Sequence, residues 1–341
     1  MMSDELKNNV ESRLPVRKVS TAQSYLDLIR LPNVFTAMAD VVMGFLFVQA
    51  ADWRWDAWSD SWTLCLLLAA SSLLYISGVV LNDVFDLEID RQQRPERPLP
   101  SGRMSLGAAR RLGWWLLMLG VVAGSATGFF VGHLRPGIVA ALLATCILLY
   151  DVWLKRTPLG PLAMGGCRML NVLLGMHALD APLPAGHWLV AGGIGVYVAG
   201  VTWFARREAE ESDRLQLGLA TLVMILGIAM LASFPSWSDR ASGGWLAMGR
   251  DGAMVNAQHT LTRWYLLTGI LGLMIVWRCL WAVLDPDPIP IRIRIAVTQC
   301  ILSIVMLDAL ACYAVRGVYW ASMVLLLALP AIFFGRSIES T

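Results

Sequence analysis

The stretch LNDVFDLEIDRQQRPERPLPSG, residues 81–102, says most about this protein. It leads out of a long apolar segment and places Asn82, Asp86 and Asp90 at intervals of four residues. Residues four apart lie on one face of an α-helix, and Asp83 lies alongside them. Several carboxylates at the end of a membrane-embedded helix repel one another and are costly to desolvate. The pattern therefore predicts a helix whose acidic face binds a cation.

The residues that follow indicate which cation to expect. Mg²⁺ prefers oxygen ligands and commonly bridges a few carboxylates to the phosphates of a substrate. Arg91, Arg94 and Arg97 come next and are suited to the remaining phosphate charge. Pro95 and Pro98 end the helix. An ordinary salt-bridged loop would not need this helical register, so the segment favours a site for magnesium and a diphosphate.

The composition indicates a membrane protein. Of the 341 residues, 57% are hydrophobic and 15% are charged, whereas a soluble domain has about 45–50% and about 25%. The net charge of +2 is too small to indicate a nucleic-acid partner. A membrane-spanning helix needs about 20 mainly apolar residues. The segments predicted to span are 33–50, 62–85, 112–132, 136–153, 159–179, 187–205, 216–234, 263–284, 295–314 and 317–335, of which the last two could form one bent element.

Lys and Arg are unevenly distributed among the loops, which predicts an orientation. One set of alternate loops carries Arg13, Arg17, Lys18, Arg30, Arg91, Arg94, Arg97, Arg103, Arg110, Arg111, Lys155, Arg156, Arg206, Arg207, Arg214, Arg292 and Arg294. The other set holds only Arg54, Arg135, Arg240 and Arg250. We therefore expect a multi-pass protein of the bacterial inner membrane whose acidic stretch faces the cytoplasm. Residues 20–31 are expected to form a short interfacial helix, and residues 235–262 the longest outer loop.

The run NDxxDxxxD followed by RPxRPxPSG resembles the first aspartate-rich motif of the UbiA superfamily of intramembrane prenyltransferases. The chain also resembles the UbiA-like members of Ebo-type bacterial gene clusters. The resemblance implies an all-α, polytopic membrane bundle of about nine or ten transmembrane helices. It implies a cytoplasmic N-terminal segment at 1–32, a UbiA-like domain at 33–336, and a magnesium–diphosphate site formed by Asn82, Asp83, Asp86 and Asp90, with Asp86 and Asp90 catalytic.

Two further segments match the pattern of this superfamily. Arg30 and Asn33 open the first span, where the superfamily commonly has an Asn near the diphosphate; a simple interfacial cap is the alternative, and it is favoured for Arg30. The fourth span ends in YDVWLKRTPLGP, which resembles an element that supplies cations to the leaving diphosphate. Tyr150, Lys155 and Arg156 are its candidate residues, with Lys155 catalytic, although such basic pairs usually serve as positive-inside anchors.

Arg168 and Asn171 lie three residues apart inside the fifth predicted span. A charge within a span should face the protein interior or a water-filled cavity. This makes Arg168 a candidate for substrate binding, together with Asn171. The alternative is a structural pairing with Asp40 or Asp308, which also fall inside predicted spans.

The sixth span ends in FARREAEESDRLQLG, where the superfamily carries its second aspartate-rich motif. Counted from the aromatic residue of that motif, Glu208 and Ser212 take the places of the two aspartates. A register set by the following Asp-Arg pair favours Glu211 and Asp213 instead. Glu208, Glu211 and Ser212 are therefore candidate metal ligands, and an ordinary salt-bridged turn is the alternative.

The resemblance implies a transferase of alkyl groups other than methyl, acting on a prenyl diphosphate donor and a lipophilic or aromatic acceptor within membrane lipid. Magnesium would assist loss of the diphosphate, and the acceptor would capture the allylic cation. A UbiA-like protein that binds or carries an isoprenoid without turnover is the first alternative, because the second motif is altered. A secondary transporter is the second alternative, but its sites usually lie at the midplane rather than at one membrane face. The sequence identifies no protein partner.

Overall fold

The chain was studied as a computed structural model, which describes residues 25, 28–49, 58–178, 180, 182–206, 214–242, 254–284 and 290–339. These residues form α-helices, one short 3₁₀ helix and the turns between them. The elements are α3 (Leu31–Val48), α4 (Trp58–Phe85), α5 (Leu87–Gln93), α6 (Leu106–Ala126), α7 (Gly128–Val131), α8 (Arg135–Val152), η1 (Leu154–Arg156), α9 (Gly160–Met176), α10 (Ala185–Ala205), α11 (Arg214–Ser242), α12 (Met254–Leu284), α13 (Pro290–Arg316), α14 (Val318–Leu326) and α15 (Ala328–Glu339).

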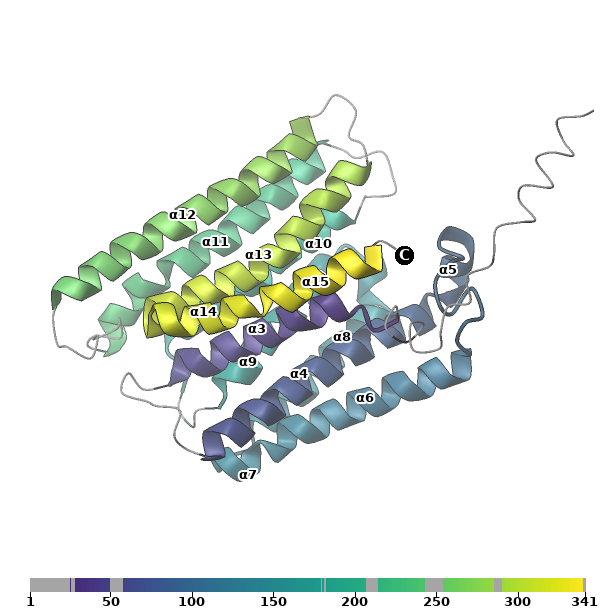
Figure 1. The fold of residues 1–341 in the computed structure, drawn as a ribbon, viewed down its shortest axis with the longest axis horizontal. Coiled ribbons are helices and arrows are strands. Elements are labelled where there is room, and N and C mark those ends of the chain that lie inside the picture. The colour runs from purple at the N-terminus through teal and green to yellow at the C-terminus, as the bar shows by residue number, and fades with distance from the viewer. Residues whose placement is uncertain are drawn as a thin grey trace, which may run out of the picture.

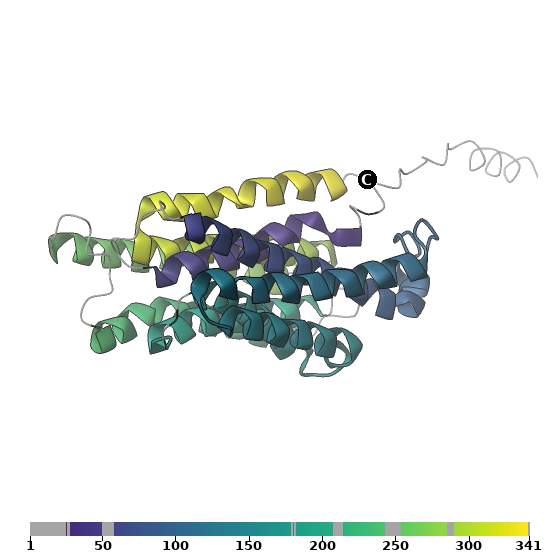
Figure 2. The same ribbon diagram turned by 90° about the horizontal axis from the view of Figure 1, so that it is seen from below.

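The long helices run roughly along one axis and form a flattened bundle (Figures 1 and 2). Helix α3 lies in its middle and packs against α4, α9, α13, α14 and α15. In its membrane-crossing window 67% of the residues are buried, compared with 28% for Leu106–Val131 at the edge of the bundle. Large apolar side chains on the outer helices, such as Trp115 and Trp277, are exposed. Exposed apolar side chains on the outer helices are typical of a bundle that faces lipid.

Eight of the described helices are long and apolar enough to cross a membrane. Helix α9 has 17 residues, which corresponds to about 25 Å, and the α14–α15 segment is also shorter than a full span. Both pack within the bundle. All ten predicted segments are thus helical, which confirms the predicted all-α, multi-pass membrane bundle. The last two form a tight pair, with Gly317 at φ 82° between α13 and α14.

One prediction about the loops was wrong. Residues 235–262 were expected to form the longest outer loop, but α11 continues to Ser242 and α12 begins at Met254. Hydropathy marks only the part of a helix that lies in hydrocarbon, and Pro235 lies inside α11 without ending it. Of the interfacial helix predicted at residues 20–31, most of the first half lies outside the described residues.

Two glycines allow α3 and α9 to approach closely in the core. A side chain at Gly44 of α3 would meet the carbonyl oxygen of Val172, and one at Gly175 of α9 would meet that of Val41. Small residues at such a crossing allow the backbones of two membrane helices to touch. The α3–α9 contact places the polar side chains earlier in these two helices opposite each other.

Candidate functional site

The acidic stretch lies at the end of α4 and in α5, at the end of the bundle where α3 begins (Figure 1). Asp86 separates the two helices, with φ −95° and ψ 6°. The N–H of Asp86 nevertheless donates to the carbonyl of Asn82 at 2.9 Å, and that of Asp90 to the carbonyl of Asp86 at 2.8 Å. The predicted helical register therefore continues through the break.

One half of the acidic stretch meets the basic pair that follows α8. The Lys155 ammonium donates to Oδ1 of Asn82 and to Oδ2 of Asp86, both at 2.8 Å. Arg156 donates from Nη2 to Oδ1 of Asp86 at 3.3 Å, and its side chain is 55% exposed. Lys155 is only 11% exposed. Residues that lie about 70 positions apart in the chain thus form one charged group.

The other half is bound by a second pair of cations. Arg97 donates to Oδ2 of Asp90 at 2.7 Å and to Oδ1 of Asp83 at 3.3 Å. Arg30 donates to the same oxygen of Asp83 at 2.8 Å. The carboxylates of Asp83 and Asp90 are 5% and 6% exposed. We call the seven residues Arg30, Asn82, Asp83, Asp86, Asp90, Arg97 and Lys155 the charged cluster.

The arginines of the stretch divide into two kinds. Arg91 is exposed and pairs with Glu88 at 2.7 Å, and Arg94 is also exposed. Arg97, by contrast, bridges two buried aspartates. Only the fold reveals this difference, because the three arginines follow the acidic residues at equal intervals of three residues.

Arg30 was favoured as an interfacial cap, but it contacts Asp83. Its backbone is left-handed, with φ 46° and ψ 53°, immediately before α3. A residue other than glycine pays about 1–2 kcal/mol for this conformation. The only feature of the sequence that pointed to a functional role for Arg30 was its position two residues before Pro32 at the start of a span.

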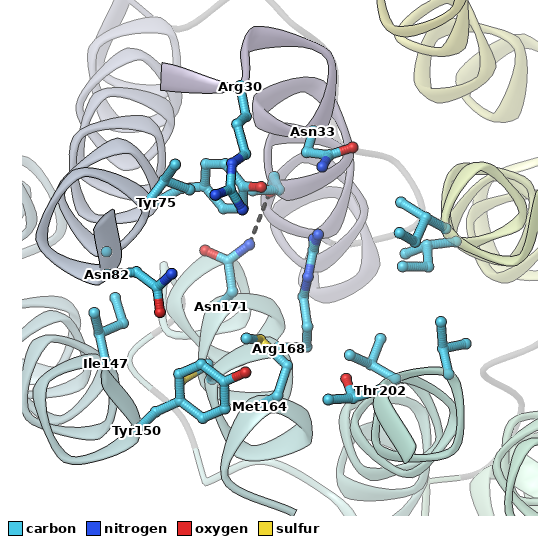
Figure 3. Close-up of a pocket in the computed structure, with 18 of the residues that line it drawn as sticks. Arg30, Asn33, Tyr75, Asn82, Ile147, Tyr150, Met164, Arg168, Asn171 and Thr202 are labelled. Carbon is cyan, nitrogen blue, oxygen red and sulfur yellow. Dashed lines mark hydrogen bonds between the residues drawn. The ribbon is translucent and has the colours of Figure 1, made fainter. Parts of the chain in front are cut away.

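A cavity of about 410 Å³ opens from the charged cluster into the bundle. Its polar wall residues include Arg30, Asn33, Tyr75, Asn82, Tyr150, Asp151, Arg168, Asn171 and Thr202. Figure 3 shows several of these side chains pointing toward a common space between the helices. Much of the remaining wall is apolar, including Leu143, Ile147, Val198, Val297 and Ile304. The cavity thus combines a charged mouth with a mainly apolar interior, which suits an amphiphile with an anionic head.

The sequence left open whether Arg168 lines a substrate site or forms a structural ion pair, and in the structure it does both. It lines the cavity, and it also donates to Oδ2 of Asp40 at 2.8 Å and to Thr36 Oγ1 at 2.6 Å. Asn171 donates to Oδ2 of Asp40 at 3.0 Å and accepts from Ser71 at 2.7 Å. The predicted pairing with Asp40 therefore holds a cavity-lining cation in place.

Sequence reasoning did not single out Asp151, although it lies directly after Tyr150. Asp151 is 3% exposed and lines the cavity. Its Oδ2 atom is buried and has no hydrogen-bond partner among the residues that the structure describes. In the sequence, Asp151 is only an acidic residue in the last turn of an apolar helix. Residue spacing does not distinguish such a residue from one that lies at the membrane interface.

A residue at the end of α10 hydrogen-bonds to the connection between α8 and α9. Arg206 donates from Nη2 to the carbonyl of Lys155 at 2.6 Å and also to the carbonyl of Thr157. This contact fixes the backbone that presents Lys155 to the acidic stretch. Glu208, Glu211, Ser212 and Asp213 follow in the chain but lie outside the described residues, so the second acidic motif remains a prediction.

The sequence profile of the UbiA prenyltransferase family matches residues 41–292. The chain belongs to the UbiA prenyltransferase family. The profile match begins ten residues after Leu31, the first residue of α3, and ends just inside α13. It includes the acidic stretch and the Lys155 segment, so the recognition made from the motif is confirmed.

Several relatives in this family are digeranylgeranylglyceryl phosphate synthases. The one from Sulfolobus acidocaldarius is 36% identical over 131 residues, which is 38% of this chain and 42% of the relative. The one from Metallosphaera sedula is 32% identical over 152 residues, which is 44% of this chain and 50% of the relative. These matches cover half or less of the relatives' length.

Solved structures of UbiA proteins share the fold. A structure described as digeranylgeranylglyceryl phosphate synthase in membranes has a TM-score of 0.58 at 21% identity, covering 88% of this chain and 99% of that chain. A UbiA homologue from Archaeoglobus fulgidus bound to GPP and Mg²⁺ has a TM-score of 0.56 at 13% identity, covering 89% and 99%. The similarity confirms a UbiA-type helical bundle in this chain.

The charged cluster fits a divalent metal in its donor chemistry. Asn82, Asp83, Asp86 and Asp90 offer the oxygen ligands that Mg²⁺ prefers. Every one of these side chains is bound to Lys or Arg here. Among the described residues, no three His, Cys, Asp or Glu side chains form a ready-made metal group. A metal would therefore replace some of these ion pairs and release cations toward a bound phosphate.

Proposed function

We propose that this chain is an intramembrane prenyltransferase. It transfers a prenyl group from a prenyl diphosphate to a lipophilic acceptor, and Mg²⁺ is its cofactor. The observation that carries this proposal is the charged cluster at the mouth of the cavity, where carboxylates and cations adjoin an apolar interior. An allylic diphosphate has the same division into an anionic head and an apolar tail.

The charged cluster would bind and activate the donor's head. Asn82, Asp83, Asp86 and Asp90 hold magnesium, which offsets the charge that develops on the leaving diphosphate. With the carboxylates engaged by a metal, Lys155, Arg97 and Arg30 would be available to donate hydrogen bonds to diphosphate oxygens. The remaining predicted residues belong to the same proposal: Asn33, Arg91, Arg94, Tyr150, Arg156, Arg168 and Asn171 in substrate binding, and Glu208, Glu211 and Ser212 at a second metal.

The apolar part of the cavity would hold the prenyl chain and keep water from the reacting carbon. Tyr75 lines this part below the cluster, where its ring face can stabilise positive charge. For the acceptor, the names of the relatives from Sulfolobus and Metallosphaera point to a glyceryl phosphate lipid. We extend this acceptor class to the present chain as part of the proposal.

The orientation belongs to the proposal as well. The charged cluster lies at the end of the bundle with the Arg- and Lys-rich loops. The positive-inside rule supports the proposal that this end faces the cytoplasm, and we propose a bacterial inner membrane as its location. A cysteine introduced at Arg103, in the loop after α5, should be labelled by a membrane-impermeant thiol reagent only after the cells are opened. Labelling in intact cells would reverse the orientation.

The test of function uses the purified full chain with labelled geranyl diphosphate or geranylgeranyl diphosphate, Mg²⁺ and a membrane lipid extract. We expect release of diphosphate together with a labelled, more hydrophobic lipid. Donor binding without release would favour a non-catalytic isoprenoid carrier. Failure to bind any prenyl diphosphate in the presence of Mg²⁺ would overturn the proposal.

A further inference from the structure

Asp151 is a buried acidic residue that does not belong to the charged cluster. It lies in the last turn of α8, four residues before Lys155. The structure gives its Oδ2 atom no hydrogen-bond partner among the described residues, and only 3% of the residue is exposed. Burying a carboxylate without a partner is costly, so this side chain does not stabilise the fold.

The position of Asp151 follows from its neighbour on α4. A side chain built on Gly78 would lie 4.0 Å from Oδ2 of Asp151. Gly78 precedes Asn82 by four residues, so it lies about 6 Å deeper along the helix axis. Asp151 therefore faces the cavity about one turn below the side chain that binds Lys155, and Gly78 and Asp151 both line the cavity.

This level is where the reacting carbon of a prenyl diphosphate would lie. A head group bound by Asn82, Asp86 and Lys155 directs its first carbon into the cavity, past Gly78. Lys155 and Arg30 attract the Asp151 carboxylate, whereas Asp86 and Asp83 repel it. A second carboxylate so close to an anionic head weakens donor binding, so Asp151 is poorly suited to be a donor anchor.

We propose that Asp151 is a catalytic residue that takes the proton from a hydroxyl-bearing acceptor. This inference rests on the proposed prenyl transfer. The acceptor oxygen forms a bond to the first carbon of the donor, and the bond from that carbon to the diphosphate oxygen breaks, leaving its electron pair on the diphosphate. The acceptor's proton moves to Oδ2 of Asp151. The products are a prenyl ether, diphosphate and a protonated Asp151, which water later deprotonates.

An amphiphilic alcohol is the class of acceptor that suits this site. A carboxylate placed beside the reacting carbon removes the proton as the oxygen nucleophile attacks. An acceptor hydroxyl reaching Gly78 would have its own apolar part in the mainly apolar cavity, beside Leu143 and Ile147. Arg168 lies in the same cavity and can bind a polar group of that acceptor.

The experiment compares wild type with Asp151→Asn in the purified full chain. Binding of geranyl diphosphate with Mg²⁺ is measured separately from transfer of labelled geranylgeranyl to a membrane lipid extract. The matched control is Asp180→Asn, which removes an exposed carboxylate paired with Arg135. We expect Asp151→Asn to bind the donor as tightly as wild type or more tightly, and to transfer about 100-fold more slowly or worse. We also expect added formate to restore part of the transfer in Asp151→Ala.

Each other outcome overturns the inference in a different way. Transfer at the wild-type rate by Asp151→Asn would show that Asp151 is not the proton acceptor. The proposed prenyl transfer itself would not be affected by that result. Loss of donor binding in Asp151→Asn would place Asp151 in the metal–diphosphate site instead. If wild type binds no prenyl diphosphate, or binds it without transfer, the proposed function fails first and this inference fails with it.

Discussion

Arg168 on α9 donates from Nη1 to Oδ2 of Asp40 on α3 across 2.8 Å, inside the membrane-spanning core. Asp40 is completely buried, and the Arg168 side chain is 11% exposed. Asp308 on α13 is also completely buried, and both of its oxygens lack hydrogen-bond partners in the described part of the chain. Arg168 thus ties α3 to α9 at the wall of the cavity.

Loss of this cation should destabilise the bundle. Arg168→Met leaves Asp40 buried without its charged partner, and breaking a buried ion pair typically costs about 3–5 kcal/mol. We expect a clearly lower midpoint of thermal unfolding in detergent, measured by the fluorescence of a thiol-reactive dye or by loss of the monodisperse peak. Arg168→Met combined with Asp40→Leu should recover much of the loss. Equal stability of Arg168→Met and wild type would contradict a structural role for the pair.

Lys155 should contribute more to donor binding than the exposed arginines of the acidic stretch. Its ammonium lies in the charged cluster, whereas Arg91 pairs with Glu88 on the surface. We expect Lys155→Ala to weaken geranyl diphosphate binding by about 10- to 100-fold, since a hydrogen bond to a charged group contributes about 1.5–3 kcal/mol. Arg91→Ala is the matched comparison: because this cation is exposed to solvent, its loss should weaken binding by no more than about fivefold. Equal losses in both variants would show that only the net charge of the segment matters.

Metal removal should abolish donor binding in wild type. Chelation of Mg²⁺ leaves the carboxylates of Asp86 and Asp90 paired with Lys155, Arg156 and Arg97, which are then less available to phosphate. Adding Mg²⁺ back should restore binding and turnover. Asp86→Ala and Asp90→Ala should stay inactive at every Mg²⁺ concentration while remaining folded. Full function in both variants, or no response to chelation, would refute the proposed metal site.

The glycine crossing of α3 and α9 should tolerate no side chain. A methyl group at Gly44 would lie 2.5 Å from the carbonyl oxygen of Val172, so Gly44→Ala must separate the helices. We expect Gly44→Ala to lower the free energy of unfolding by about 1–3 kcal/mol. We also expect it to slow prenyl transfer, because separating the helices displaces Arg168. Gly107→Ala is the control, because nothing lies within 4 Å of that position in α6, and it should be neutral or stabilising. Destabilisation by Gly107→Ala alone would be inconsistent with the observed packing.

Periodicity in the sequence predicted much of the local structure. Each predicted span is a helix, because long apolar runs can satisfy their backbone groups in lipid only by helix formation. The helical register of the acidic stretch was also predictable, because residue spacing along one helix fixes which side chains share a face. The outer loop at residues 235–262 was wrong because hydropathy does not mark where a helix ends outside the hydrocarbon.

Spacing along the chain by itself determined a membrane bundle with an acidic helix end suited to magnesium and phosphate. Only the tertiary structure decided which cations meet that acidic end, since Lys155 reaches Asn82 and Asp86 from a different helix connection. It also decided that Arg97 and Arg30 contact Asp83 while Arg91 faces solvent, and that Asp151 lies close to Gly78 in the wall of a cavity. The physical reason is that contacts between segments far apart in sequence depend on how helices pack, and residue spacing within one helix carries no information about its neighbours.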